Sequence, residues 1–314
     1  MDVSIIFPVR NLEKEMKGIL EHLQGQTSAF SFEIVIVDMG SDDSTLAKSL
    51  VLLRQYGLPG FVVQNGPGGP AAALNSGLHR AQGKYVAFLL ASHLYKDILP
   101  GLFSTAELTE ADMVFGSQTE EESRLAERQS MSRVVKKKSG AEYLQACLEG
   151  KLQIDLAAVL LRRQFLLENH LWFQEDCRYG YREEFLYRCL LRAEETAPSP
   201  VLLQRESQLE WRCEEPYGHQ VFQRVEAMLR VRDIIWCEYN LPVVAEWMTD
   251  QKIPQTIMEC VDILLREKVP LATVRKEMKT RGFDRLLQVR KYTQSTLKKK
   301  IRSWKFPLRP YFPS

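Results

Sequence analysis

The sequence predicts an α/β protein with a mostly parallel sheet flanked by helices, followed by an α-helical C-terminal extension. Short apolar or β-branched runs bounded by turn residues alternate with helical patterns in the first part of the chain. Such alternation is typical of βαβ units, whose strands are buried on both faces. From about residue 216 the pattern changes to long amphipathic helices, in which apolar and charged faces alternate.

The expected elements follow from these runs in chain order. Strands are expected at Val3–Val9, Glu33–Val37, Gly60–Gln64, Tyr85–Leu90 and 111–116. Helices are expected at Leu12–Leu23, Ser44–Tyr56, Gly69–Ala81 and Ser139–Gly150. Asp43 or Ser44 can cap the second helix, because Asp and Ser side chains accept bonds from free helical N–H groups. Segment 117–140 is polar and is expected to be a mobile loop or a solvated helix.

The length of 314 residues fits two domains. We place the boundary near residue 213, which gives a domain at 1–213 and a helical extension at 214–314. The helices expected in the extension are 216–238, 241–250, 254–267, 270–281 and 283–303. The tail Lys298–Phe312 mixes basic and aromatic residues.

Composition excludes several classes of protein. A hydrophobic content of 45% and a charged content of 26% are ordinary for a globular protein, and a net charge of +2 does not indicate a nucleic-acid binder. The six cysteines form no C-x-x-C pair and have no zinc-ligand spacing, so we expect reduced thiols. The chain begins directly with a strand, without the pattern of a signal peptide, and no apolar run reaches about 20 residues. These features predict a cytoplasmic protein that meets a membrane only from its inner face.

Polar tips follow three of the expected strands. They are Pro8–Asn11, Asp38–Ser41 and 91–93. Ligands of open α/β sheets bind at the carboxyl ends of the strands, so the three tips are expected to converge on one crevice. No G-x-x-x-x-G-K or G-x-G-x-x-G string follows a strand, which excludes a P-loop or dehydrogenase site.

The strands and tips together resemble the donor half of family 2 glycosyltransferases, the inverting enzymes of the GT-A type. The resemblance implies a nucleotide-sugar domain in which Asp38 binds the nucleotide base, with Gly40 and Ser41 completing its tip. Pro8, Val9 and Asn11 would form the wall of the nucleoside site. In an alternative interpretation, Asp38 is a strand-end carboxylate that caps the next helix through Ser41.

A glycine-rich block at 65–77 is the second point of resemblance. Its glycines permit close backbone approach, and the helix that follows offers free N–H groups to an anion. The resemblance places Asn65, Gly69 and Asn75 beside the donor diphosphate. The alternative is a plain loop before a core helix.

The third tip departs from the family pattern. Family members carry Asp-x-Asp there, which holds a divalent metal, whereas this chain has Leu90-Ala91-Ser92 followed by His93. Hard cations prefer carboxylate oxygens, so we expect no metal cofactor of this kind, with Ser92 kept only as a donor-side contact. His93 is expected to be a surface histidine. Either basic groups neutralise the diphosphate, or the protein binds its ligands without chemistry. The basic groups considered are Arg10, Lys84 and the cluster 136–138, and Arg10 could instead stack on a base.

The acceptor half is represented by segment 173–188. Family members have Glu-Asp-x-x-Phe-x-x-Arg there, and the Asp is the general base that deprotonates the acceptor hydroxyl. Aligning Phe185 and Arg188 puts Tyr181-Arg182 at the acidic pair, and a register shift of two puts Glu183-Glu184 there instead. Glu184, and then Glu183, are therefore the candidate bases. The alternative is that both are solvated first-turn acids.

Three other features belong to this half. Glu175 and Asp176 are expected to be loop residues. Val201–Arg212 resembles the strand and turn that follow in these enzymes, and Trp211 is expected to be a core tryptophan rather than a sugar platform.

The function expected from the resemblance is transfer of a sugar from a UDP-sugar or similar donor to a glycan or lipid-linked acceptor in bacterial surface-polysaccharide synthesis. A catalytically inactive relative that binds nucleotide, glycan or a partner transferase is the alternative. The basic and aromatic tail predicts peripheral contact with an anionic membrane, or else a solvated segment.

Overall fold

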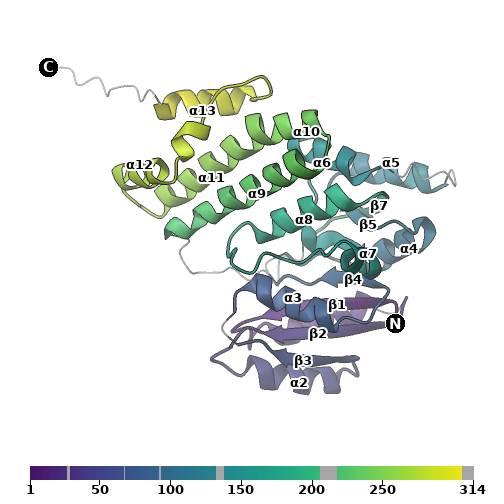
Figure 1. The fold of residues 1–314 in the computed structure, drawn as a ribbon. Coiled ribbons are helices and arrows are strands. Elements are labelled where there is room, and N and C mark those ends of the chain that lie inside the picture. Colours follow the sequence, from purple (N-terminus) through teal and green to yellow (C-terminus); the bar gives the residue numbers. More distant parts are fainter. Residues whose placement is uncertain (27–28, 67, 92, 132–137, 206–217, 306–314) are drawn as a thin grey trace. The chain divides into compact units, whose positions relative to one another are not determined.

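The computed structural model describes residues 1–26, 29–66, 68–91, 93–131, 138–205 and 218–305 (Figure 1). The chain divides into two compact units, which are described separately. The first consists of Met1–Leu144 and Leu152–Glu214, and the second of Gln145–Lys151 and Glu215–Ser314. The predicted boundary at 213 falls on residues outside the described ranges.

A mixed, mostly parallel sheet forms the centre of the first unit. Within the described ranges it has seven strands in the order β3-β2-β1-β4-β6-β5-β7. Their bounds are β1 Val3–Val9, β2 Phe32–Asp38, β3 Gly60–Gln64, β4 Tyr85–Phe88, β5 Met113–Ser117, β6 Val159–Arg162 and β7 Thr196–Leu202. Strand β6 runs antiparallel to β4 and to β5, and the other pairings are parallel. The carboxyl ends of β1, β2 and β4 therefore lie at one edge, as the sequence predicts.

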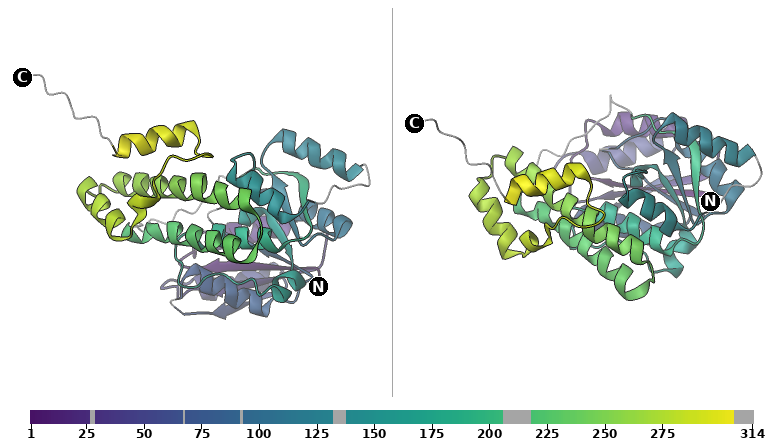
Figure 2. Two further views of the ribbon diagram at one scale, coloured as in Figure 1. Left: turned by 45° about the horizontal axis from the view of Figure 1, so that its top comes forward. Right: turned by 90° about the horizontal axis from the view of Figure 1, so that it is seen from above.

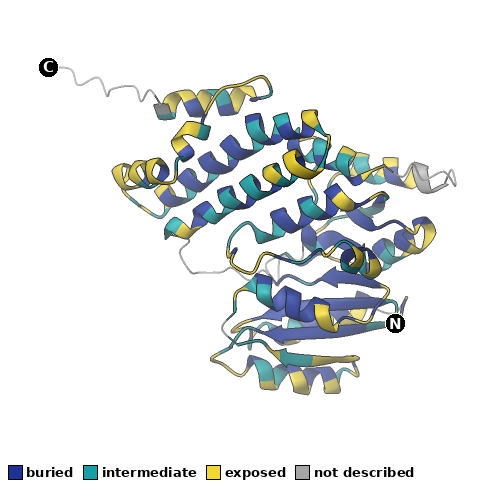
Figure 3. Ribbon diagram, viewed as in Figure 1, coloured by how far each residue is buried: buried dark blue, intermediate teal, exposed yellow. Residues whose placement is uncertain are grey.

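Helices flank this sheet on both sides (Figures 1 and 2). Their bounds are α1 Met16–Gln26, α2 Thr45–Gln55, α3 Pro70–Arg80, α4 Leu99–Thr109, α5 Glu120–Met131, α7 Arg163–Glu168 and α8 Tyr181–Arg192. Helix α6, Gly140–Leu148, begins in this unit, and its residues from Gln145 belong to the second. All residues of β1 and β4 are buried, whereas the edge strand β3 is largely exposed (Figure 3). Close packing of α3 depends on Gly77, because a Cβ there would lie 2.4 Å from Ile6 Cγ2. The absence of a side chain at Gly77 lets α3 pack closely against β1. The start of α3 therefore lies near the strand tips.

Several sequence predictions for this unit need correction. The strands Val3–Val9 and Gly60–Gln64 are confirmed at their predicted bounds. Helix α4 and strand β6 were not predicted. The polar segment after residue 117 contains helix α5, which is one of the two expected alternatives. The segment Val201–Arg212 was expected to hold a strand and the turn after it, but the strand β7 begins earlier, at Thr196, and ends at Leu202. Residues 206–217, with Trp211, lie outside the described ranges.

The described part of the second unit is helical, as predicted. Its helices are α9 Gln223–Glu238, α10 Pro242–Trp247, α11 Ile253–Arg266, α12 Leu271–Thr280 and α13 Ser295–Lys305. A π-helical turn, Met248–Lys252, joins α10 to α11, and α9 lies beside α11 (Figures 1 and 2). Of the helices that the structure describes, none has both the length and the apolar character needed to span a membrane.

The predicted helix 283–303 is wrong over its first part. A 3₁₀ turn, Phe283–Leu286, is followed by irregular chain, and α13 begins only at Ser295. The irregular part is fixed by side-chain bonds, since Thr293 Oγ1 donates to Asp250 O at 2.9 Å. These bonds replace the helical hydrogen bonds that the amphipathic pattern alone suggested.

Candidate functional site

The tips of β1 and β2 are joined by hydrogen bonds between their side chains and backbones. Ser41 Oγ accepts from the Asn11 backbone N–H at 3.1 Å and donates to Asp38 Oδ1. Asn11 Oδ1 in turn accepts from the Asp42 N–H at 2.9 Å. Asn11 has a positive φ of 52°, a conformation that Asn adopts more readily than most residues. The two tips therefore form one rigid element at the carboxyl edge of the sheet.

Asp38 lies at the centre of this element and is 1% exposed. Its Oδ2 accepts from the backbone N–H groups of Gly40 and Ser41, each at 3.2 Å. Its carbonyl oxygen accepts from Asn65 N–H at 2.9 Å, which ties the glycine-rich block to the same tip. The contact with Ser41 is thus present. The N-cap residue of α2 is Ser44, whose side chain makes no capping bond, and Asp43 accepts from the Thr45 N–H at 3.0 Å.

The glycine-rich block leads into the start of α3. Gly66 has a positive φ of 67°, and Gly69 is the N-cap of α3, with Pro70 in the first turn. No side chain caps this helix start, so its free N–H groups are available to a ligand. Asn75 lies further along α3 and is used differently. Its amide bonds the backbone of Phe173 and the Glu175 carboxylate, away from the position that the resemblance gave it.

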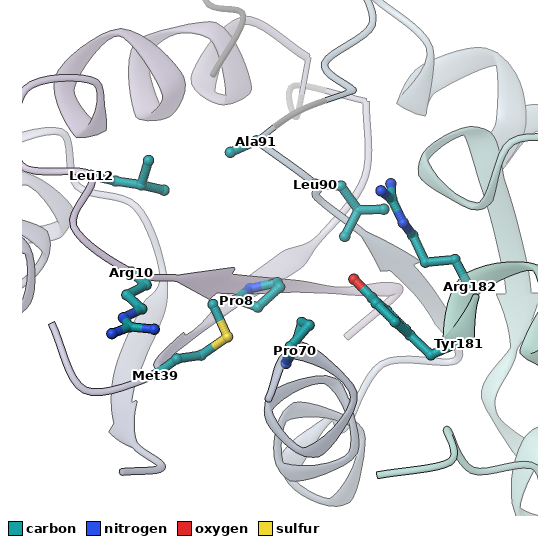
Figure 4. A pocket seen from close by; sticks show the side chains of 9 residues that line it. All are labelled: Pro8, Arg10, Leu12, Met39, Pro70, Leu90, Ala91, Tyr181 and Arg182. Carbon is teal, nitrogen blue, oxygen red and sulfur yellow. The ribbon is translucent and has the colours of Figure 1, made fainter. Parts of the chain in front are cut away.

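A pocket of about 90 Å³ opens beside these elements (Figure 4). The residues that line it are Pro8, Arg10, Leu12, Met39, Pro70, Leu90, Ala91, Tyr181 and Arg182. Of the predicted donor-side residues, Pro8 lines it directly. Val9 has its side chain in the apolar core, so only its backbone can reach a ligand. The pocket brings together the first tip, the third tip, the start of α3 and the start of α8.

The residues at the third tip do not fit a metal. Leu90 and Ala91 line the pocket with apolar side chains, and Ser92 lies outside the described residues. Across the described ranges, no group of three or more His, Cys, Asp and Glu side chains could hold a metal ion. Mg²⁺ and Mn²⁺ prefer oxygen ligands, chiefly carboxylates. The described side chains at this tip therefore do not match such a cation.

His93 is not the surface histidine expected from the sequence. Its Nδ1 lies 2.6 Å from Asp155 Oδ2, and the same oxygen accepts from Tyr95 Oη at 2.8 Å. Burial opposes ionisation of Asp155. The hydrogen bond and charge of His93, with the Ala157 N–H and Tyr95, outweigh it and lower the Asp155 pKa to about 2. The cluster fixes the chain after β4 to the chain before β6, a pairing that no local motif in the sequence indicates.

Helix α8 places the predicted acceptor residues. It begins after Gly180, whose φ is 91°, and its first residues, Tyr181 and Arg182, line the pocket. Glu184 is 3% exposed, and Glu183 accepts from Tyr187 Oη at 3.1 Å. Because Glu184 is buried, the solvated alternative does not describe it. Neither glutamate is among the residues that line the pocket. Glu175 and Asp176 lie in an exposed loop, as expected.

Two of the basic groups considered for the diphosphate lie elsewhere. Lys84 precedes β4 at the opposite edge of the sheet and pairs with Glu107 at 2.7 Å. The backbone of Lys138 forms an isolated β-bridge with Thr196 at the start of β7, which is also at that far edge. Lys136 and Lys137 lie outside the described residues. Arg10 lines the pocket, and so does Arg182. In the sequence, Arg182 stands out only as a residue that replaces the acid of the family motif.

Comparison with known proteins identifies the family. The family model described as Glycosyl transferase family 2 matches residues 4–171. This chain belongs to glycosyl transferase family 2. The match includes all three strand tips and ends before α8, so it does not cover the candidate acceptor residues Glu183 and Glu184.

Curated relatives of this family 2 protein are bacterial glycosyltransferases. Glycosyltransferase GlyG of Streptococcus pneumoniae is 28% identical over 116 residues, which cover 37% of this chain and 38% of GlyG. The uncharacterized glycosyltransferase EpsJ of Bacillus subtilis is 25% identical over 203 residues, which cover 61% of this chain and 57% of EpsJ. The chain thus spans less than two thirds of the length of these relatives.

Solved structures support the fold of this family 2 protein over almost its whole length. The structure of S. aureus TarS 1-349 in complex with UDP-GlcNAc has a TM-score of 0.64 at 18% identity, covering 97% of this chain and 87% of that one. The mannosyltransferase PcManGT from Pyrobaculum calidifontis, in complex with GDP-Man and Mn²⁺, has a TM-score of 0.55 at 15% identity, covering 96% and 84%. At these identities the similarity concerns the fold.

Proposed function

We propose that this family 2 protein transfers a sugar from a nucleotide-sugar donor, such as a UDP-sugar, to a hydroxyl of a glycan or lipid-linked acceptor, with inversion. The setting we propose is bacterial surface-polysaccharide synthesis on the cytoplasmic side of the membrane. The observation that carries the proposal is the rigid tip around Asp38, which borders a pocket at the carboxyl edge of the sheet. The TarS complex with UDP-GlcNAc, a structure of similar fold, supports a nucleotide sugar as the donor.

The proposed reaction is a single displacement. The acceptor oxygen forms a bond to the anomeric carbon while the bond from that carbon to the donor diphosphate breaks. The acceptor proton passes to a general base, because an alcohol is a weak nucleophile until it begins to lose its proton. Glu184 and Glu183 are the proposed bases, since they lie in the first turn of α8, within two residues of the pocket residue Arg182. Burial of Glu184 means that acceptor binding must open a path to its carboxylate.

A second candidate is a binding protein without transferase activity. It is favoured by two observations at the pocket, namely the apolar side chains of Leu90 and Ala91 and the cationic side chain of Arg182. By the resemblance, Leu90 stands at the position of one metal ligand of the family and Arg182 at the position of its base. Such a protein would bind the nucleotide, a glycan or a partner transferase.

Release of nucleoside diphosphate from a panel of UDP- and GDP-sugars distinguishes the two candidates. The panel is run with cell-wall glycan and lipid-linked acceptors, and titration calorimetry with UDP and GDP is run in parallel. Acceptor-dependent release identifies the enzyme. Binding without release across the panel supports the second candidate. Absence of both binding and release contradicts the enzyme and the nucleotide-binding form of the second candidate.

A further inference from the structure

The pocket beside the third tip has the composition of an anion site. Among its nine lining residues, two are arginines and none is acidic. Within the part of the chain that the structure describes, neither Arg10 nor Arg182 makes a hydrogen bond or ion pair. The Arg182 guanidinium carbon lies over the ring of its neighbour Tyr181, 6.0 Å from the ring centroid. Two cations on one small pocket repel each other, so an anion is the occupant that lowers their energy most.

Two helix starts add to this positive field. Pro70 is the first residue of α3 and Tyr181 is the first residue of α8, and both line the pocket. Neither helix has a side-chain cap at its start. The N-terminal end of a helix carries partial positive charge and free N–H groups, which favour anions. The pocket thus combines two guanidinium groups with two uncapped helix starts.

The arginines come from different parts of the fold. Arg10 lies on the tip of β1, and Arg182 lies in the first turn of α8, on the same side of the pocket as Leu90 (Figure 4). A guanidinium binds phosphate oxygens through two parallel N–H bonds, which a lysine cannot do. Arginines on opposite sides can therefore contact different oxygens of one extended anion.

The size of the pocket suits part of a nucleotide rather than the whole. Its volume is about 90 Å³, whereas sites that enclose whole small molecules are about 300–1,000 Å³. The base and the donor sugar must then lie outside it, and the phosphates inside.

We propose that Arg10 and Arg182 hold the diphosphate of the donor in this pocket and neutralise it without a divalent metal. The proposal rests on the proposed function, since it names the groups that bind its donor. When the bond from the anomeric carbon to the diphosphate oxygen breaks, negative charge grows on that oxygen. Fixed cations in a partly closed site stabilise such charge as a metal does elsewhere. Leu90 and Ala91 then serve as apolar walls, because a site without a metal needs no carboxylate ligands at this tip.

Calorimetric titration of the full chain with UDP and with uridine tests the proposal. Wild-type affinity for UDP is expected to be the same with EDTA as with Mn²⁺, and to fall as salt concentration rises. Arg182→Gln is expected to weaken UDP binding by about 10- to 100-fold, as for loss of a charge-assisted hydrogen bond, and to leave uridine binding unchanged. Arg10→Gln is expected to act in the same direction. Arg54→Gln removes an exposed charge on α2 and is the matched control, with affinity unchanged.

Distinct results would overturn the proposal and the function. Strict dependence of UDP binding on Mn²⁺, or UDP affinity unchanged in both arginine variants, would overturn the arginine site while leaving a nucleotide-sugar protein. Equal weakening of UDP and uridine would show a structural role for the arginines and would also overturn it. Failure of the wild-type chain to bind either ligand would overturn the proposed function itself.

Discussion

The side-chain amide of Asn75 makes hydrogen bonds with both backbone polar groups of Phe173. Asn75 Oδ1 accepts from the Phe173 N–H at 2.8 Å, and its Nδ2 donates to the Phe173 carbonyl at 2.9 Å. Phe173 stacks on Phe185 of α8, with ring centroids 3.8 Å apart. One asparagine on the donor side thus positions the chain that leads into the acceptor helix, although the residues are 98 positions apart.

Asn75→Ala is expected to destabilise the fold. It leaves the buried N–H and carbonyl of Phe173 without partners, which costs about 2–4 kcal/mol for two backbone groups. Chemical denaturation followed by circular dichroism measures the loss. Asn75→Asp, which keeps an acceptor but adds a charge beside Glu175, is expected to be no better. A free energy of unfolding equal to wild type in both variants would contradict a stabilising role for the two Asn75–Phe173 hydrogen bonds.

Asp38→Ala is expected to weaken UDP binding by about 1–3 kcal/mol, because the tip loses the carboxylate that orders it and a polar partner for the base. Titration calorimetry on the folded variant measures the effect. Asp42→Ala, which removes an exposed carboxylate from the same turn, is the control. Equal affinities of wild type and Asp38→Ala would remove Asp38 from the donor site.

Glu184→Gln is expected to retain donor binding and lose most transfer, since general-base assistance contributes about 10²–10⁴ in rate. The measurement is acceptor-dependent release of UDP at saturating donor. Turnover that survives in Glu183→Gln/Glu184→Gln would exclude both residues and direct attention to Glu175 and Asp176.

Acid stability is expected to depend on Asp155. The pKa of Asp155 is about 2 in the folded protein and 3.8 in the unfolded chain, so folding favours its ionised form. The resulting stabilisation, about 2 kcal/mol, is complete above pH 4 and is lost as the pH falls toward 2. Denaturation curves between pH 5 and about pH 2 measure it. Asp155→Asn is expected to flatten the dependence in this window, and an unchanged slope would contradict the assignment.

Contact with an anionic membrane is expected to involve α13. Its Lys299 and Arg302 are exposed, whereas Leu297 and Ile301 are buried, and the tail 306–314 lies outside the described residues. Each basic residue near an anionic surface contributes about 1 kcal/mol. Lys299→Ala/Arg302→Ala should therefore reduce binding to phosphatidylserine vesicles by about tenfold or more in sedimentation assays. Lys276→Ala/Lys279→Ala on α12 is the charge-matched control, and equal losses in both would point to net charge alone.

The donor half of the fold could be predicted because its strands are continuous apolar runs between turn residues. Strand β1 is an example, because it is one continuous apolar run. The tip around Asp38 is another, because its bonds to Gly40 and Ser41 join residues that are close in the sequence. Strand β6 could not be found in this way, because four residues give too short a pattern and its antiparallel direction depends on its neighbours. Helix α4 lacks a clear polar face, which removes the periodic signal.

The site was predictable only in part, for a related reason. Pro8 and Asp38 belong to local motifs, so the sequence indicates their place at the edge of the sheet. The Asp155–His93 pair and the position of Arg182 arise from residues brought together by folding. Asn75 illustrates the limit, because its motif suggested a ligand contact whereas its amide bonds the protein backbone.

The antiparallel strand β6 also sets an order of assembly during synthesis. Strands β1 to β4 pair with one another and can associate once the first 88 residues have left the ribosome. Strand β5 pairs only with β6 and β7 among the described strands, so it has no partner until residue 162 has been made. During that interval β4 presents an open edge, which is a site of aggregation for nascent chains. Chains arrested between β5 and β6 should therefore be the ones that most need a chaperone.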